Sequence, residues 1–137
     1  MTAPTVVRWH TGTVTRTLVA VAVGGVVGAL ARYGLSVLWP TPFGAFGWTT
    51  LAVNASGCLL IGVLMGRLDR VSAPAWVRPA LGVGVLGGYT TFSGYAAEAL
   101  ATGQRHGPPL AIAYLAATLV TAIVAVWLGT ALAGRPR

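Results

Sequence analysis

Charged side chains are scarce in this sequence of 137 residues. Only 8% of the residues are charged, Asp69 and Glu98 are the only acids, and all nine basic residues are arginine. With 55% hydrophobic residues and a mean hydropathy of +0.77, the chain lacks the polar surface of a soluble domain. The composition predicts a membrane protein of a single domain, 1–137. Basic membrane proteins usually owe a positive net charge, here +7, to their cytoplasmic loops, so we expect no nucleic-acid binding.

Groups suited to catalysis or metal binding are also few. The single cysteine, Cys58, lies in an apolar run, which excludes an internal disulfide and argues against a metal site built on cysteine. His10 and His106 fall outside the apolar runs, and the two acids do not form a pair in the sequence. We therefore expect no catalytic residues and no enzyme.

Long apolar runs, in contrast, are abundant. Runs of about 20 residues are long enough to cross a bilayer as helices, and short connections make neighbouring helices antiparallel. The sequence predicts an all-α membrane protein with four transmembrane helices, at about 18–39, 48–65, 79–101 and 110–132. Residues 1–16 are polar, and we expect them to be frayed or interfacial rather than a cleaved signal.

Arginine is distributed unevenly over the two sides of such a bundle. Both termini and the second loop share one side, whereas the other side has Arg105, with Arg32 toward the far end of the first span. The richer side carries Arg8, Arg16, Arg67, Arg70, Arg78, Arg135 and Arg137. The positive-inside rule therefore predicts cytoplasmic termini for a multi-pass protein of the cell inner (plasma) membrane.

The third span contains residues that break or decorate helices. Its segment 84–98 reads GVLGGYTTFSGYAAE, and the potential ion ligands in it are Gly87, Gly88, Thr90, Thr91 and Ser93. Non-helical backbone at membrane depth survives only where it is buried in protein or lines a wet cavity. We therefore predict that the third helix is broken at its centre. The alternative is a glycine-rich packing face without a break.

Small residues recur at helical spacing elsewhere too. They predict close helix contacts in the first and second spans, at Gly24, Gly25, Gly28, Gly57 and Gly62. The GGVVG run at 24–28 resembles a nucleotide-binding fingerprint, but no strand precedes it, so we expect no dinucleotide site.

Isolated polar residues in the apolar spans need an explanation. The side chain of Arg32 is either paired inside the bundle or snorkels to the membrane interface. Asn54 either clamps two helices or lines a polar track with Thr50, one turn earlier on the same face. Thr118 on the fourth span either joins that track or bonds back to its own helix.

Three segments together resemble the CrcB/Fluc family of fluoride channels. They are GGVVGALARY at 24–33, VNASGCLLIG at 53–62 and GVLGGYTTFSGYAAE at 84–98, in the family's order and each in its expected helix. The resemblance implies a channel that passively exports fluoride from the cytoplasm and lowers fluoride toxicity. It also implies an antiparallel, dual-topology dimer with two pores. A structural sodium ion at the dimer centre would be held by the main-chain carbonyls of Gly87 and Thr90.

The resemblance also assigns the pore. Phe92 and Tyr95 match the two pore aromatics, although the family pattern TTFSTF here reads TTFSGY, so Tyr95 and Gly94 depart from it. Arg32 matches an arginine of the pore vestibule. The remaining residues implied to line the fluoride path are Asn54, Thr50, Thr91, Ser93, Tyr114 and Thr118.

The choice of partner follows from the arginine bias. A homodimer must insert one chain in both orientations, which requires nearly balanced charge, and this chain is unbalanced. We favour a heterodimer with an oppositely inserted paralogue, with the homodimer as the alternative. Two other functions stay open: a proton-coupled transporter of the small multidrug type, which uses a carboxylate in its first span, and a non-transporting membrane scaffold.

Overall fold

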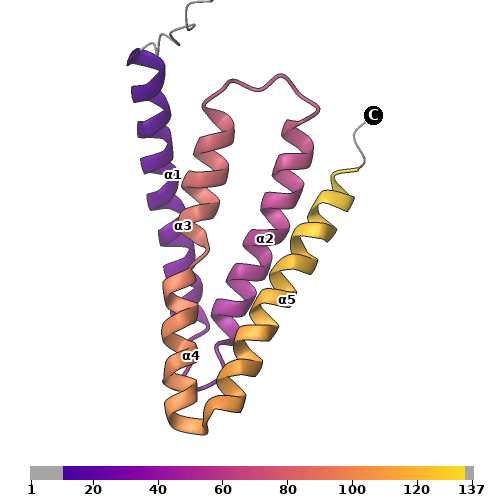
Figure 1. The fold of residues 1–137 in the computed structure, drawn as a ribbon. Coiled ribbons are helices and arrows are strands. Elements are labelled where there is room, and N and C mark those ends of the chain that lie inside the picture. The colour runs from indigo at the N-terminus through magenta and orange to yellow at the C-terminus, as the bar shows by residue number, and fades with distance from the viewer. Residues whose placement is uncertain (1–10, 135–137) are drawn as a thin grey trace, which may run out of the picture.

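The structure, a computed structural model, describes residues 11–134, and all regular elements within that range are helices (Figure 1). The helices are α1 (Thr11–Leu38), α2 (Trp48–Leu68), η1 (Pro79–Leu86), α3 (Gly87–Tyr89), α4 (Phe92–His106) and α5 (Pro108–Leu132). The predicted all-helical fold is thus confirmed.

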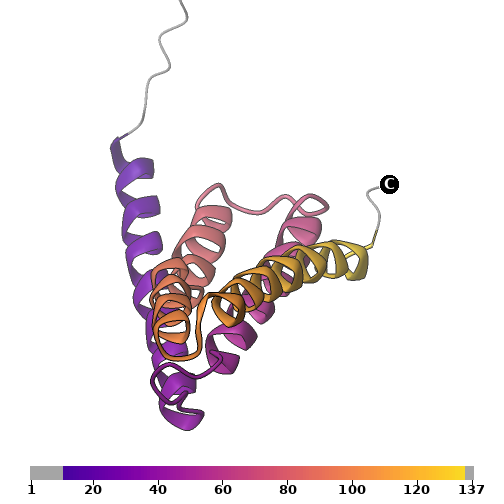
Figure 2. The same cartoon turned by 60° about the horizontal axis from the view of Figure 1, so that its bottom comes forward.

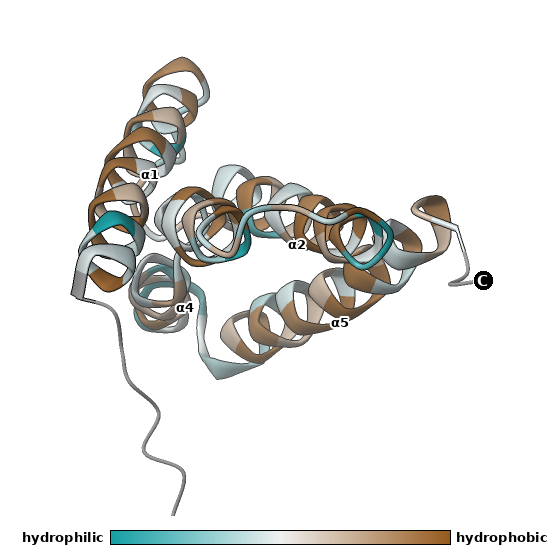
Figure 3. Ribbon diagram, turned by 90° about the horizontal axis from the view of Figure 1, so that it is seen from above, coloured by the Kyte–Doolittle hydropathy of each residue, from teal (hydrophilic) through white to brown (hydrophobic). Residues whose placement is uncertain are grey.

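Three unbroken helices in the described range are long and apolar enough to cross a membrane. They are Gly12–Leu38, Trp48–Leu68 and Pro108–Leu132, and seen from above α1 and α5 are mostly hydrophobic along their length (Figure 3). The remaining crossing is assembled from η1, α3 and α4 in series, so the bundle has the four crossings expected. This crossing starts at Pro79 as predicted but ends at His106, beyond the expected 101.

The first helix begins earlier than the hydropathy indicates. Helix α1 starts at Thr11 rather than near residue 18, because a helix continues through polar residues as long as its backbone bonds are made. Part of the predicted segment 1–16, together with Arg8, His10, Arg135 and Arg137, lies outside the described residues. The start of α1, the 69–78 connection and the end of α5 lie at the same end of the molecule in two views (Figures 1 and 2).

Glycines allow the helices to touch at backbone distance. A Cβ on Gly28 would lie 2.0 Å from the carbonyl oxygen of Val85, so α1 packs directly on η1. On the other side of the molecule, Gly62 of α2 faces Gly129 of α5 in the same way. Close contacts are also found at Gly24 and Gly57, which confirms the predicted role of the small residues. Gly25 contributes its backbone, which lies against Gly88.

The crossing that carries the break starts with an unusual helix. Residues Pro79–Leu86 form a π-helix, and the N–H of Gly87 reaches back to the carbonyl of Gly82, five residues earlier. Such wide turns are rare and occur frequently at functional sites. The geometry leads the chain into the short helix α3 and then into extended backbone.

Candidate functional site: a helix break beside a polar cavity

The third crossing is interrupted between α3 and α4. Thr90 has φ −77° and ψ 160°, and Thr91 has φ −145° and ψ 124°, so both residues are extended. The side chain of Thr91 then caps α4 by accepting a hydrogen bond of 3.0 Å from the N–H of Gly94. The predicted break is therefore present, and the alternative of an uninterrupted glycine-rich helix is wrong.

Asn54 supplies the partners that the broken backbone lacks. Its Nδ2 donates to the carbonyl of Thr91 at 3.0 Å, and its Oδ1 accepts from the N–H of Thr91 at 2.9 Å. The clamp predicted as one of two alternatives is thus seen, joining α2 to the break. Since Asn54 is buried, both bonds are shielded from water and satisfy groups that are costly to leave unpaired.

Arg32 reaches the break from the opposite side. Its Nε donates to the carbonyl of Gly88 at 3.3 Å, and the residue is half-buried. Of its two alternatives, the structure favours the interior role over snorkelling. A further contact joins Ser56 of α2 to Tyr89, whose hydroxyl oxygens lie 2.9 Å apart. Helices α1 and α2 are thereby fastened to the segment between Gly88 and Thr91.

A cavity of about 280 Å³ opens beside the break. It brings together the predicted site residues from three helices and adds Cys58, Leu119 and Ala122, which were not assigned to the pore. The predicted residues that line it are Asn54, Thr90, Thr91, Phe92, Tyr95 and Thr118. Ser93 is exposed near Thr91, and Thr50 and Tyr114 lie in a neighbouring cluster.

The two aromatic residues of the motif lie edge to face. The ring centroids of Phe92 and Tyr95 are 5.4 Å apart at 66°, and Tyr95 also approaches Tyr114 at 6.1 Å. Phe92 is 79% exposed, so in a single chain its outer side contacts nothing. Both rings line the cavity, and an aromatic ring carries partial positive charge at its edge.

Glu98 is the functional candidate that sequence reasoning missed. Its Oε1 accepts a hydrogen bond of 2.7 Å from Thr50, and its Oε2 accepts one of 2.6 Å from the fully buried Tyr114. A Cβ on Gly47 would lie 2.0 Å from Oε2, so a larger residue there would displace the carboxylate from its present position. The available signal was an acid within an apolar segment, on the same helix as Tyr95.

The Glu98 cluster connects two cavities. On one side, Tyr95 joins it to the cavity at the break through Tyr114. On the other side, Glu98 lines a second cavity of about 280 Å³ beneath the 41–45 loop. Thr118 contributes less than expected, because its hydroxyl donates to the carbonyl of Tyr114 in its own helix, as the second alternative predicted. Polar groups therefore run from the break to the loop end of the bundle.

The backbone at the break also suits a hard cation. Side chains donate to the carbonyls of Gly88 and Thr91, but within residues 11–134 no side chain donates to those of Gly87 and Thr90. Gly87 is exposed on the surface of the single chain. Among the described residues, no three His, Cys, Asp or Glu lie near enough to one another to hold a metal ion. Carbonyl oxygens are hard ligands, which suit a hard cation.

Comparison with known proteins identifies the family. The family model described as "CrcB-like protein, Camphor Resistance (CrcB)" matches residues 19–130. The chain is 52% identical to the fluoride-specific ion channel FluC 1 of Streptomyces coelicolor over 79% of this chain and 71% of that protein. It is 47% identical to FluC 2 of Nocardia farcinica over 82% of this chain and 81% of the relative. It is 44% identical to FluC of Azotobacter vinelandii over 80% and 90%, respectively.

These relatives are named as ion channels, a family without enzymes, which confirms the prediction that the chain is not an enzyme. The match spans all four crossings, from within α1 to near the end of α5. The chain belongs to the CrcB family.

Proposed function

We propose that this chain is a fluoride-specific ion channel. The observation that carries the proposal is the hydrogen-bonded clamp of Asn54 on Thr91, which holds extended backbone beside a cavity within a membrane crossing. Irregular backbone is tolerated there only if it is buried or lines a path. The names of the relatives supply the ion, fluoride.

The anion path runs along donors and ring edges. Asn54 carries two N–H groups, and only one donates to Thr91, so the other is available to an anion in the cavity. Phe92 and Tyr95 offer ring edges, and Tyr95 adds a hydroxyl. The path also includes the hydroxyls of Thr91, Ser93 and Thr118, with Arg32 at its vestibule.

The hydroxyls of Thr50 and Tyr114 are the donors nearest the second cavity. Both now point at Glu98, which orients them and holds them in place. Fluoride accepts the same kind of hydrogen bond, so an arriving ion competes with Glu98 for these two groups. We therefore include Glu98 as a positioning residue of the path.

A structural sodium ion and a second subunit complete the proposed assembly. The carbonyls of Gly87 and Thr90, from both subunits of an antiparallel dimer, would hold the sodium ion at the dimer centre. When bound, the ion supplies fixed positive charge that favours an anion nearby. The exposed ring of Phe92 and the exposed Gly87 support the proposal, because a partner would cover both.

The partner, the membrane and the direction of transport follow from charge. Arg16 belongs to the first turns of α1, and Arg67, Arg70 and Arg78 lie in or beside the 69–78 connection at the same end of the molecule (Figure 1). Among the described residues, Arg105 belongs to the last turn of α4, which ends at the opposite end. This bias favours one orientation in the inner membrane, with cytoplasmic termini, and a heterodimer with a paralogous subunit over a homodimer. The inside-negative potential would then drive fluoride outward without ATP or proton coupling.

Two other functions are weaker. A small multidrug-type transporter needs a carboxylate in its first span, and α1 contains neither Asp nor Glu. A membrane scaffold that transports nothing does not require a helix break that Asn54 holds open beside a cavity.

The decisive experiment is fluoride efflux from liposomes that contain the purified chain, with chloride as the control anion. Rapid fluoride-selective efflux from the chain alone would support the channel and make a homodimer sufficient. Efflux only after co-expression with a paralogue would support the heterodimer. Absence of fluoride efflux from both preparations would overturn the proposed function and favour a non-transporting membrane scaffold.

A further inference from the structure

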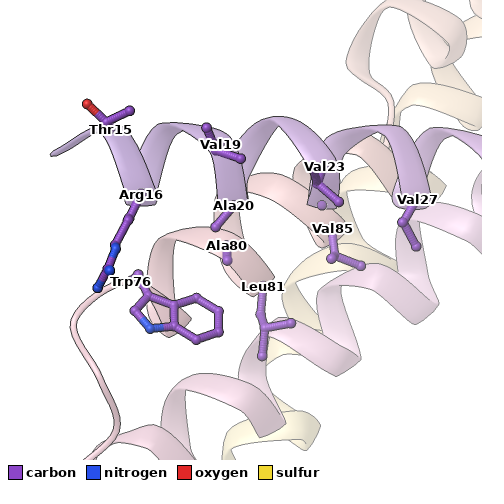
Figure 4. A pocket seen from close by; sticks show the side chains of 11 residues that line it. Thr15, Arg16, Val19, Ala20, Val23, Val27, Trp76, Ala80, Leu81 and Val85 are labelled. Atoms are coloured by element: carbon purple, nitrogen blue, oxygen red, sulfur yellow. The ribbon is translucent and has the colours of Figure 1, made fainter. Parts of the chain in front are cut away.

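A groove runs along the outer surface between α1 and the start of the third crossing. Its walls are an evenly spaced row of valines on α1 and apolar residues of η1, and its volume is about 650 Å³ (Figure 4). The row consists of Val19, Val23 and Val27, each more than half exposed, and Leu81 faces them. The floor is shallow because Gly24 brings α1 against the carbonyl of Ala80.

The groove is about as long as one membrane leaflet is thick. From Arg16 to Val27 the helix rises about 16 Å at about 1.5 Å per residue, which is close to half of the roughly 30 Å hydrocarbon core. Its inner end lies near the middle of α1, next to the contact of Gly28 with Val85. One acyl chain of a lipid in that leaflet therefore matches the groove in length.

The outer end of the groove carries a positive charge. Arg16 and Trp76 line the same end of the groove (Figure 4). Indole rings favour the membrane interface. The chain has only two acids: Asp69 pairs with Arg78, and Glu98 binds Thr50 and Tyr114. Within residues 11–134, neither acid pairs with Arg16, and its side chain is exposed.

We propose that this groove binds an anionic phospholipid. The phosphate pairs with the guanidinium of Arg16 beside the indole of Trp76, and one acyl chain lies along Val19, Val23 and Val27. The arginine-rich end of the molecule favours the anionic leaflet, where each arginine near the surface contributes about 1 kcal/mol. This site does not depend on the proposed fluoride path, because the cavity at the break is lined by residues of α2, α4, α5 and the break itself, none of which lines the groove.

The test uses a full-length variant in which Trp76 is the only tryptophan, with phenylalanine replacing Trp9, Trp39, Trp48 and Trp127. The protein is reconstituted into phosphatidylcholine bilayers that contain either brominated phosphatidylglycerol or brominated phosphatidylcholine, and quenching of Trp76 is recorded. We expect phosphatidylglycerol to be preferred about five-fold, the factor that about 1 kcal/mol provides. Arg16→Gln should remove this preference, whereas Arg105→Gln, at the opposite end, should leave it unchanged.

Equal quenching by the two lipids, with or without Arg16, would overturn the proposal, because the groove would then be an unselective part of the lipid contact. Absence of quenching by either lipid would also overturn it and would indicate that a second copy of the chain covers the groove. Fluoride efflux of Arg16→Gln, measured in parallel, keeps the two proposals separate, since loss of lipid preference with normal efflux affects only this one.

Discussion

Asn54 shows how much of the site depends on single side chains. The amide satisfies both backbone groups of Thr91 and still has one N–H to offer. The two bonds from Asn54 replace the backbone hydrogen bonds that Thr91 would make within an unbroken helix. The conformation of the break therefore depends on Asn54.

Asn54→Asp should reduce fluoride efflux by at least about tenfold. The carboxylate loses the donor to the carbonyl of Thr91, and a buried acceptor left unpaired costs roughly 1–3 kcal/mol. It also places a negative charge in the proposed path of the anion. Cys58→Ala is the matched control, since Cys58 lines the same cavity, and its efflux should stay near wild type. Equal rates in the two variants would remove Asn54 from the path.

Tyr114→Phe tests the second cluster. The change deletes one hydroxyl and leaves Oε2 of Glu98 without its 2.6 Å partner, which costs roughly 1–3 kcal/mol. We expect fluoride efflux to fall about tenfold at that energy. Tyr33→Phe, on the exposed face of α1, removes a hydroxyl without such a partner and should be neutral. Unchanged efflux in Tyr114→Phe would contradict the role of this cluster.

At the scale of residues, sequence reasoning found the cavity but missed one carboxylate. Asn54, Phe92 and Tyr95 were assigned from motifs and do line a common cavity. The role of Glu98 was not predicted because its partners, Thr50 and Tyr114, are 48 and 16 residues away in the chain. A hydrogen bond between residues so far apart in the chain leaves no local pattern in the sequence.

Among the elements, the third crossing differs most from an ordinary membrane helix. Its composition predicted a break, because glycine and hydroxyl residues cluster at its centre. The π-helix before the break was not predicted, since hydropathy records which residues are present and not whether they bond four or five positions back. Its contact with α1, however, rests on glycines that are visible in the sequence.

Gly28→Ala should destabilise the folded protein by about 1–3 kcal/mol, the usual cost of overpacking. The new methyl would meet the backbone of Val85 at 2.0 Å, and backbone atoms cannot move aside as a flexible side chain can. Gly34→Ala lies on the same helix with no atom within 4 Å and should be neutral or slightly stabilising. Thermal unfolding in detergent measures both, and equal melting temperatures would refute the close contact.

For the whole molecule, the four crossings and the clustering of arginines at one end could be read from the sequence, and the positions of the helices agree with them. The proposed dimer rests on a different signal. It would cover the exposed Phe92 and Gly87, and the preference for a paralogue over a second copy rests on the arginine bias.

Sodium offers a test at this scale. If the carbonyls of Gly87 and Thr90 bind the ion only in the assembled protein, sodium at about 100 times its Kd should stabilise the assembly by about 2.7 kcal/mol. We expect a higher melting temperature in sodium chloride than in N-methylglucamine chloride at equal ionic strength. Identical melting temperatures would argue against a structural sodium ion.

The clamp on Thr91 also constrains how the protein is made. An N–H and a carbonyl left without partners in lipid each cost several kcal/mol, so the third crossing is not a stable insertion unit by itself. Its missing partner belongs to α2, which the ribosome delivers first. Membrane integration of the third crossing therefore has to wait for, and be completed against, a helix that is already in place. A chain in which α2 is delayed would present the translocon with a segment that it cannot release into lipid.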